Sequence, residues 1–100
     1  MLPKNCSIND LVIDGIVIKE KEQQGLQHLK EMQETTDMHR VSVSYREVKR
    51  CLSDMEAIFS RYDSPKQIPS AVALYNNLIS AIKNSPFKTL EDFRDLEQIK

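Results

Sequence analysis

Eight apolar residues, separated by alternating steps of three and four, run through the middle of this 100-residue chain. All eight positions of this central stripe are apolar, against four of the other seventeen positions between residues 38 and 62, so composition alone does not explain the pattern. A mean step of about 3.5 residues keeps one side of an α-helix against a neighbouring helix. The stripe therefore predicts packed helices, and its members are Met38, Val41, Tyr45, Val48, Leu52, Met55, Phe59 and Tyr62.

Local signals mark the ends of this central helix. Ser44 and Glu47 have the spacing of a capping box, which places the helix at residues 44–62. The letters VSVSY at its start alternate between apolar and polar residues as a strand does, so the sequence does not decide between helix and strand for the turn before Ser44. Beyond the helix, Pro65 and Pro69 both suit the first turn of a following helix, where a backbone N–H has no partner to lose.

That following segment, residues 68–82, is apolar over a wide arc, with two adjoining stripes at helical spacing. The short connection over residues 63–69 makes it the expected antiparallel partner of the central helix. The letters KNSP end it, because the residue before Pro86 is pushed away from helical geometry. A last short helix is expected with Thr89 as its cap.

Residues 19–36 consist of good helix formers but offer only a narrow apolar side, made of Leu26, Leu29 and Met32. Gly25 costs about 1 kcal/mol relative to Ala inside a helix, so we expect this helix to start late or to bend there. A helix of this kind has little to bury.

The letters LVIDGIVI at residues 11–18 are the one segment that favours strands. Asp14 and Gly15 tolerate the positive φ angles of a type I′ turn, between two three-residue runs of β-forming residues. A lone two-stranded hairpin is marginally stable, so its aliphatic side chains need a surface to cover. Two interpretations stay open. The segment folds back on the chain's own helices, as a hairpin or as irregular chain, or it adds to a partner.

The predicted fold is all-α, a small helical bundle built on an antiparallel helical hairpin. Residues 1–18 form an N-terminal arm, with a short β-hairpin as one alternative, and residues 19–100 form the helical part of a single domain. A chain of this length holds only a small core.

Composition and charge narrow the function. Asp plus Glu outnumber Lys plus Arg by 15 to 14, so there is no strong field to attract nucleic acid or an acidic membrane. No segment approaches the roughly 20 apolar residues that span a bilayer, and the N-terminus lacks a signal-peptide pattern. With Cys6 and Cys51 as the only cysteines, a reducing compartment is favoured, and we expect a cytoplasmic protein.

No catalytic, cofactor-binding or metal-binding residues are predicted. His28, His39, Cys6 and Cys51 could complete a zinc site only without the local ligand pairs that structural zinc sites use. No phosphate-cradling glycine loop or nucleophile motif is present. The acidic residues after Thr89 are explained by favourable interaction with the start of a helix.

The apolar surface exceeds what one helical hairpin hides, and this surplus predicts a protein partner or a homo-oligomer. The expected function is a non-enzymatic protein–protein interaction module, such as a small adaptor, chaperone or assembly subunit. Two alternatives are a small DNA-binding regulator using Arg46, Lys49 and Arg50, and a subunit or chaperone of a bacterial secretion apparatus, which shares only the organisation of two helices around a proline corner. The predicted partner-binding residues are Leu11, Val12, Ile13, Ile16, Val17, Ile18, Tyr45, Val48, Leu52, Met55, Phe59 and Tyr62.

Overall fold

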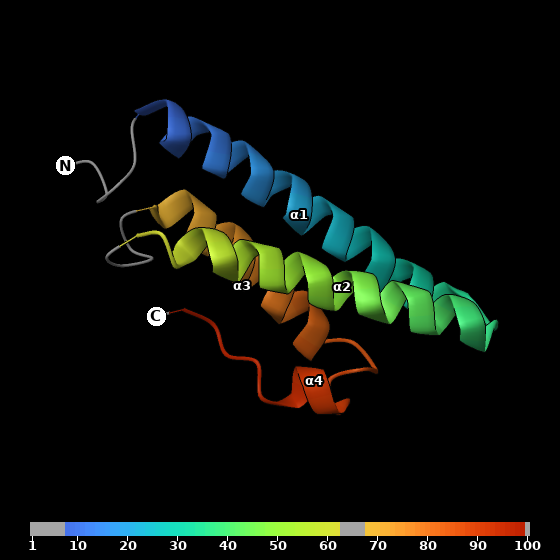
Figure 1. The fold of residues 1–100 in the computed structure, drawn as a ribbon. Coiled ribbons are helices and arrows are strands. Elements are labelled where there is room, and N and C mark those ends of the chain that lie inside the picture. Colours follow the sequence, from blue (N-terminus) through green and yellow to red (C-terminus); the bar gives the residue numbers. More distant parts are fainter. Residues whose placement is uncertain (1–7, 63–67, 100) are drawn as a thin grey trace.

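The structure, a computed structural model, describes residues 8–62 and 68–99, with side chains from residue 11 onward. Every regular element in these two ranges is an α-helix, and neither range contains a strand. The helices, labelled in Figure 1, are α1 (Ile8–Glu34), α2 (Met38–Phe59), α3 (Pro69–Lys83) and α4 (Glu91–Arg94).

Helices α1 and α2 are joined by three residues and pack as an antiparallel hairpin, and α3 packs against α1. The short α4 and the chain after it run back along α3, on the side of α3 away from α1, as Figure 1 shows. The predicted all-α bundle built on a helical hairpin is therefore confirmed. The prediction of which helices form the hairpin was wrong. The central helix was expected to pair with the helix that follows it, α3, but α2 packs most extensively against the preceding helix, α1.

The start of α2 also differs from the prediction. Asp37 is the N-cap, and its carboxylate accepts a hydrogen bond of 2.9 Å from the backbone N–H of His39. The VSVSY segment is helical, so Ser44 lies inside the helix and not at its end. Its buried hydroxyl donates to Glu31 Oε2 of α1 at 3.2 Å, a contact between the helices of the hairpin.

The β-hairpin that was one alternative for residues 11–18 is not formed, and this segment is part of α1. The helical arrangement turns Asp14 and Ile18, four residues apart, toward the same side, and both are buried. An alternating strand would place residues 14 and 18 on the same side as Ile16, which is exposed in the structure. Residues 1–7 of the predicted arm lie outside the described residues.

Gly25 neither delays nor interrupts α1, which continues through it. It is buried where α1 meets α3, and a Cβ at this position would lie 2.7 Å from Leu78 Cδ2. Glycine therefore allows α1 and α3 to approach closely.

The core runs along the contact of α1 with α2 and α3 and includes Phe93 of α4. Most of the central stripe lies in it, together with one stripe from each neighbouring helix. Its buried members are Ile18, Leu29, Met32, Val48, Leu52, Met55, Ile58, Phe59, Tyr62, Ile68, Ala71, Tyr75, Leu78, Ile79, Ile82 and Phe93.

Candidate functional site

The predicted partner-binding residues of α2 and the turn after it lie inside the protein. Val48, Leu52, Met55, Phe59 and Tyr62 are buried, and they pack against the chain's own helices. They hold the fold together and present no surface to another chain in this structure.

Tyr45 is half-buried at the edge of the same core. Its ring packs edge-on against Phe93, with ring centroids 5.1 Å apart. Its hydroxyl donates to the Asp92 carboxylate of α4, and burial is the main reason that the pKa of this phenol is raised. Tyr45 therefore ties the C-terminal part of the chain to α2.

The predicted residues of α1 separate into two groups. Ile18 is buried, and Leu11 and Val17 are half-buried against the core. The other three point away from it, with exposed fractions of 56% for Val12, 55% for Ile13 and 55% for Ile16. Ile16 lies four residues after Val12 and three after Ile13, the spacings of neighbours on a helix surface, so the three side chains form a contiguous exposed surface that we call the α1 aliphatic face.

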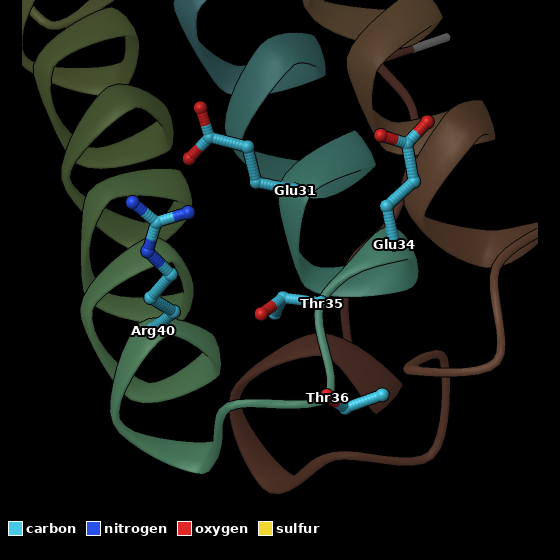
Figure 2. Close-up of a pocket in the computed structure, with 5 residues that line it drawn as sticks. All are labelled: Glu31, Glu34, Thr35, Thr36 and Arg40. Atoms are coloured by element: carbon cyan, nitrogen blue, oxygen red, sulfur yellow. The ribbon is translucent and has the colours of Figure 1, made fainter.

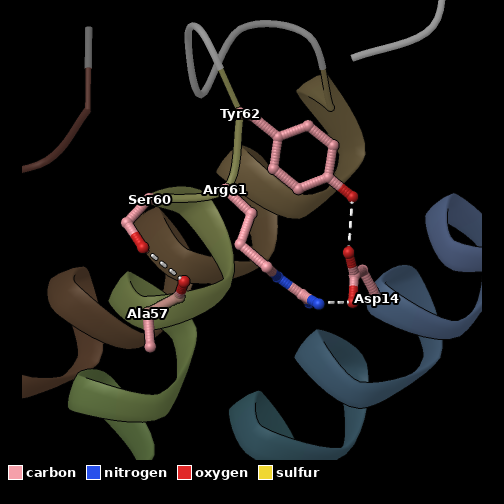
Figure 3. Close-up of polar contacts among 5 residues, drawn as sticks. All are labelled: Asp14, Ala57, Ser60, Arg61 and Tyr62. Carbon is pink, nitrogen blue, oxygen red and sulfur yellow. Dashed lines mark hydrogen bonds and ion pairs between the residues drawn. The ribbon is translucent and has the colours of Figure 1, made fainter. Parts of the chain in front are cut away.

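The α1 aliphatic face is backed by a buried polar contact on the opposite side of the helix. Asp14 accepts hydrogen bonds from the Arg61 guanidinium and, at 2.6 Å, from the Tyr62 hydroxyl (Figure 3). The side chains of Arg61 and Tyr62, just after the end of α2, thereby hold the N-terminal part of α1 against the rest of the fold. Further along, the Lys21 ammonium lies 3.0 Å from Asp54 of α2, and Glu22 accepts a 3.0 Å hydrogen bond from the Asn77 amide of α3. The helix that carries the aliphatic face is thus fixed to both of its neighbours.

A polar cavity of about 350 Å³ lies at the turn between α1 and α2. Glu31 and Arg40 extend beside each other from the two helices, whereas Glu34 points to the other side of α1 (Figure 2). Both acids and Arg40 are exposed. A hydrogen bond from Gln27 is the main reason that the pKa of Glu31 is lowered, so this carboxyl stays ionised. General acid chemistry needs the opposite shift, produced by desolvation.

The basic side of α2 is partly neutralised within the chain. Lys49 lies 3.1 Å from the Asp92 carboxylate and 5.2 Å from the centroid of the Tyr45 ring. The hydrogen bond from Tyr45, followed by that from Lys49, lowers the pKa of Asp92. Arg46 and Arg50 are exposed, so only two of the three cations proposed to contact DNA remain available.

His28, His39 and Cys51 do not form a metal centre among the described residues, and Cys6 lies outside them. His28 is half-buried, with Nδ1 3.5 Å from Glu31 Oε2. Cys51 is a buried free thiol whose pKa is raised chiefly by that burial. Within residues 8–62 and 68–99, no group of three or more His, Cys, Asp or Glu side chains is placed to hold a metal ion. No helix in these ranges combines the length and the apolar character needed to cross a membrane.

No protein-family model, curated protein or solved structure matches this chain. Among the large apolar side chains that are exposed in the described residues, those of the α1 aliphatic face form one contiguous group. The others are Met38 and Val43 on α2 and Leu90 beside α4.

Proposed function

We propose that this protein is a non-enzymatic protein-binding module, and that the α1 aliphatic face is its docking surface. The observation that carries the proposal is the exposure of Val12, Ile13 and Ile16 side by side on one well-held helix. Burial of apolar surface contributes about 25 cal/mol per Å², so covering three half-exposed aliphatic side chains favours association. Contiguous apolar patches on small domains often mark such interfaces.

The rigid backing of this face supports the same function. Asp14 is held by Arg61 and Tyr62 on the core side of α1, so the aliphatic side chains on the outer side belong to an ordered helix. A pre-ordered surface loses less conformational entropy on binding than a segment that must fold first. A small adaptor, chaperone or assembly subunit in a reducing compartment such as the cytoplasm is compatible with this surface and with the free thiol of Cys51.

Site-specific photo-crosslinking in the cells that make the protein tests this proposal. A photoreactive phenylalanine at Ile13 probes the face, and the same group at Val43, which is 41% exposed on α2, is the matched control. We expect a discrete adduct from position 13 that is absent from position 43 and is lost when Ile16→Glu is added. Equal adducts from both positions, or none from position 13, would overturn the proposed docking surface.

A further inference from the structure

The two glycines of α1 differ in a way that points to a missing neighbour. At Gly25 the space of a side chain is filled by Leu78 of α3, and the glycine is explained by that contact. At Gly15 an added Cβ would meet no atom of the described residues within 4 Å. A glycine inside a helix costs about 1 kcal/mol relative to alanine, and among residues 8–62 and 68–99 no contact compensates for it at position 15.

Gly15 belongs to the same exposed surface as the aliphatic residues. Positions 12, 15, 16 and 19 are i, i+3, i+4 and i+7 of one helix, the four corners of a hole that receives a side chain from a facing helix. Val12, Ile16 and Lys19 occupy three corners, and all are exposed. Because the fourth corner is a glycine, a facing side chain can come as close to the α1 backbone as Leu78 does at Gly25.

We propose that the partner of the α1 aliphatic face is a second copy of this chain, bound through an antiparallel α1–α1 contact in which Ile16 of each copy lies over Gly15 of the other. This inference rests on the proposed function and names its partner. A two-fold interface requires one surface to be complementary to itself. The α1 aliphatic face together with the adjacent Gly15 meets this requirement, because this surface carries both the projecting side chain, Ile16, and the hole, at Gly15.

The charges around the face are compatible with this contact. Val12, Ile13, Gly15 and Ile16 are uncharged, and the charge of Asp14 is paired on the core side. With the two-fold axis between residues 15 and 16, Lys19 lies beside Val12 of the second copy, where its aliphatic stem covers the apolar surface. The two Lys19 side chains are then separated by roughly 10 Å along the axis, from a rise of 1.5 Å per residue, and repel little in water.

The size of the face sets the strength of the contact. A stable dimer usually buries about 800 Å² per partner, far more than three half-exposed aliphatic side chains provide. The dimer is therefore reversible and depends on protein concentration.

Sedimentation equilibrium of the full chain from about 10 µM to 1 mM tests the inference. We expect a monomer–dimer equilibrium for the wild type and at least tenfold weaker association for both Gly15→Leu and Ile16→Glu. Gly15→Leu fills open space, so its melting temperature should equal or exceed that of the wild type, which separates lost association from lost folding. Val43→Glu on α2 is the matched control and should associate as the wild type does.

Disulfide trapping in a Cys6→Ser background fixes the orientation. Ile16→Cys lies next to the two-fold axis and should form a covalent dimer, whereas the two copies of Val12→Cys are roughly 10 Å apart along the axis, too far for a disulfide. Covalent dimers from Val12→Cys would show a parallel pair and overturn the proposed geometry.

A wild type that stays monomeric to 1 mM in sedimentation equilibrium would overturn the homodimer. In that case a position-specific adduct of Ile13 with a different protein would leave the proposed function standing, and the absence of any adduct would remove both.

Discussion

Leu78 of α3 lies directly over Gly25 of α1, so close that a Cβ on the glycine would meet Leu78 Cδ2 at 2.7 Å. Leu78 is fully buried, so its side chain has little room to move away. The same addition at Gly15 meets open space. Two chemically identical changes in one helix should therefore affect stability with opposite signs.

We expect Gly15→Ala to raise the free energy of unfolding by up to about 1 kcal/mol, because alanine is the better helix former. In Gly25→Ala the same gain is opposed by overpacking, which typically costs about 1–3 kcal/mol, so the variant should be less stable than the wild type. Urea denaturation at low protein concentration measures both values. A Gly25→Ala variant as stable as Gly15→Ala would show that α1 and α3 are not in close contact.

Asp14 is a second position where a small change should have a large effect. In Asp14→Ala the buried Tyr62 hydroxyl loses the acceptor that it meets at 2.6 Å, which should lower the free energy of unfolding by about 1–3 kcal/mol. Arg61 is half exposed and can turn to water, so its loss of the partner adds little. Asp14→Asn keeps an acceptor for Tyr62 and is the matched control, with a smaller loss. Equal losses in the two variants, measured by urea denaturation, would contradict the importance of this hydrogen bond.

The sequence predicted the helical class because the central stripe is apolar at every step of three or four, and burial of Val48, Leu52 and Met55 follows from that spacing. It also predicted Pro69 in the first turn of the following helix and the stop before Pro86, whereas Pro65 and the rest of residues 63–67 lie outside the described residues. These are local features, which a single helix period or a single turn residue determines.

The helix pairing could not be predicted in the same way. Asp14 and Gly15 have high turn propensity, and only the tertiary contacts with Arg61 and Tyr62 explain an acid on the buried side of a helix. One signal in the sequence does indicate the longer helix: Leu11, Ile18, Gly25 and Met32 are each seven residues apart. Once α1 extends to residue 8, it covers α2, and most of the surplus apolar surface that suggested a large interface disappears into the chain's own core.

Met55 and Met38 allow a direct test of which part of the central stripe is buried. Met55 is fully buried, whereas Met38, at the start of α2, is 76% exposed. We expect Met55→Ala to lower the free energy of unfolding by about 2–5 kcal/mol through lost burial and the cavity left behind. Met38→Ala removes the same atoms from the surface and should change stability by less than about 0.5 kcal/mol. Similar melting temperatures for the two variants would contradict the packing of α2 described here.

Tyr75 should make the protein less stable at alkaline pH. Burial, followed by the 2.8 Å hydrogen bond to Glu56 and the negative charge of that residue, raises the pKa of the Tyr75 phenol well above its ordinary value of 10.0. Above pH 10 the unfolded chain releases the phenolic proton while the folded chain retains it, so the free energy of unfolding falls as pH rises toward the folded-state pKa. Below pH 10 the phenol is neutral in both states and the full stabilisation is present.

Tyr75→Phe isolates this contribution because phenylalanine fills the same space beside Phe59, whose ring packs edge-on at 5.6 Å between centroids, but cannot ionise. At pH 7 the variant should lose only about 0.5–1.5 kcal/mol, the net contribution of one hydrogen bond. Its stability should then decline less steeply than that of the wild type between pH 10 and pH 12, measured by thermal denaturation followed by circular dichroism. Parallel curves for the two proteins over that range would show that Tyr75 keeps its ordinary ionisation, and that the α2–α3 contact is open to water.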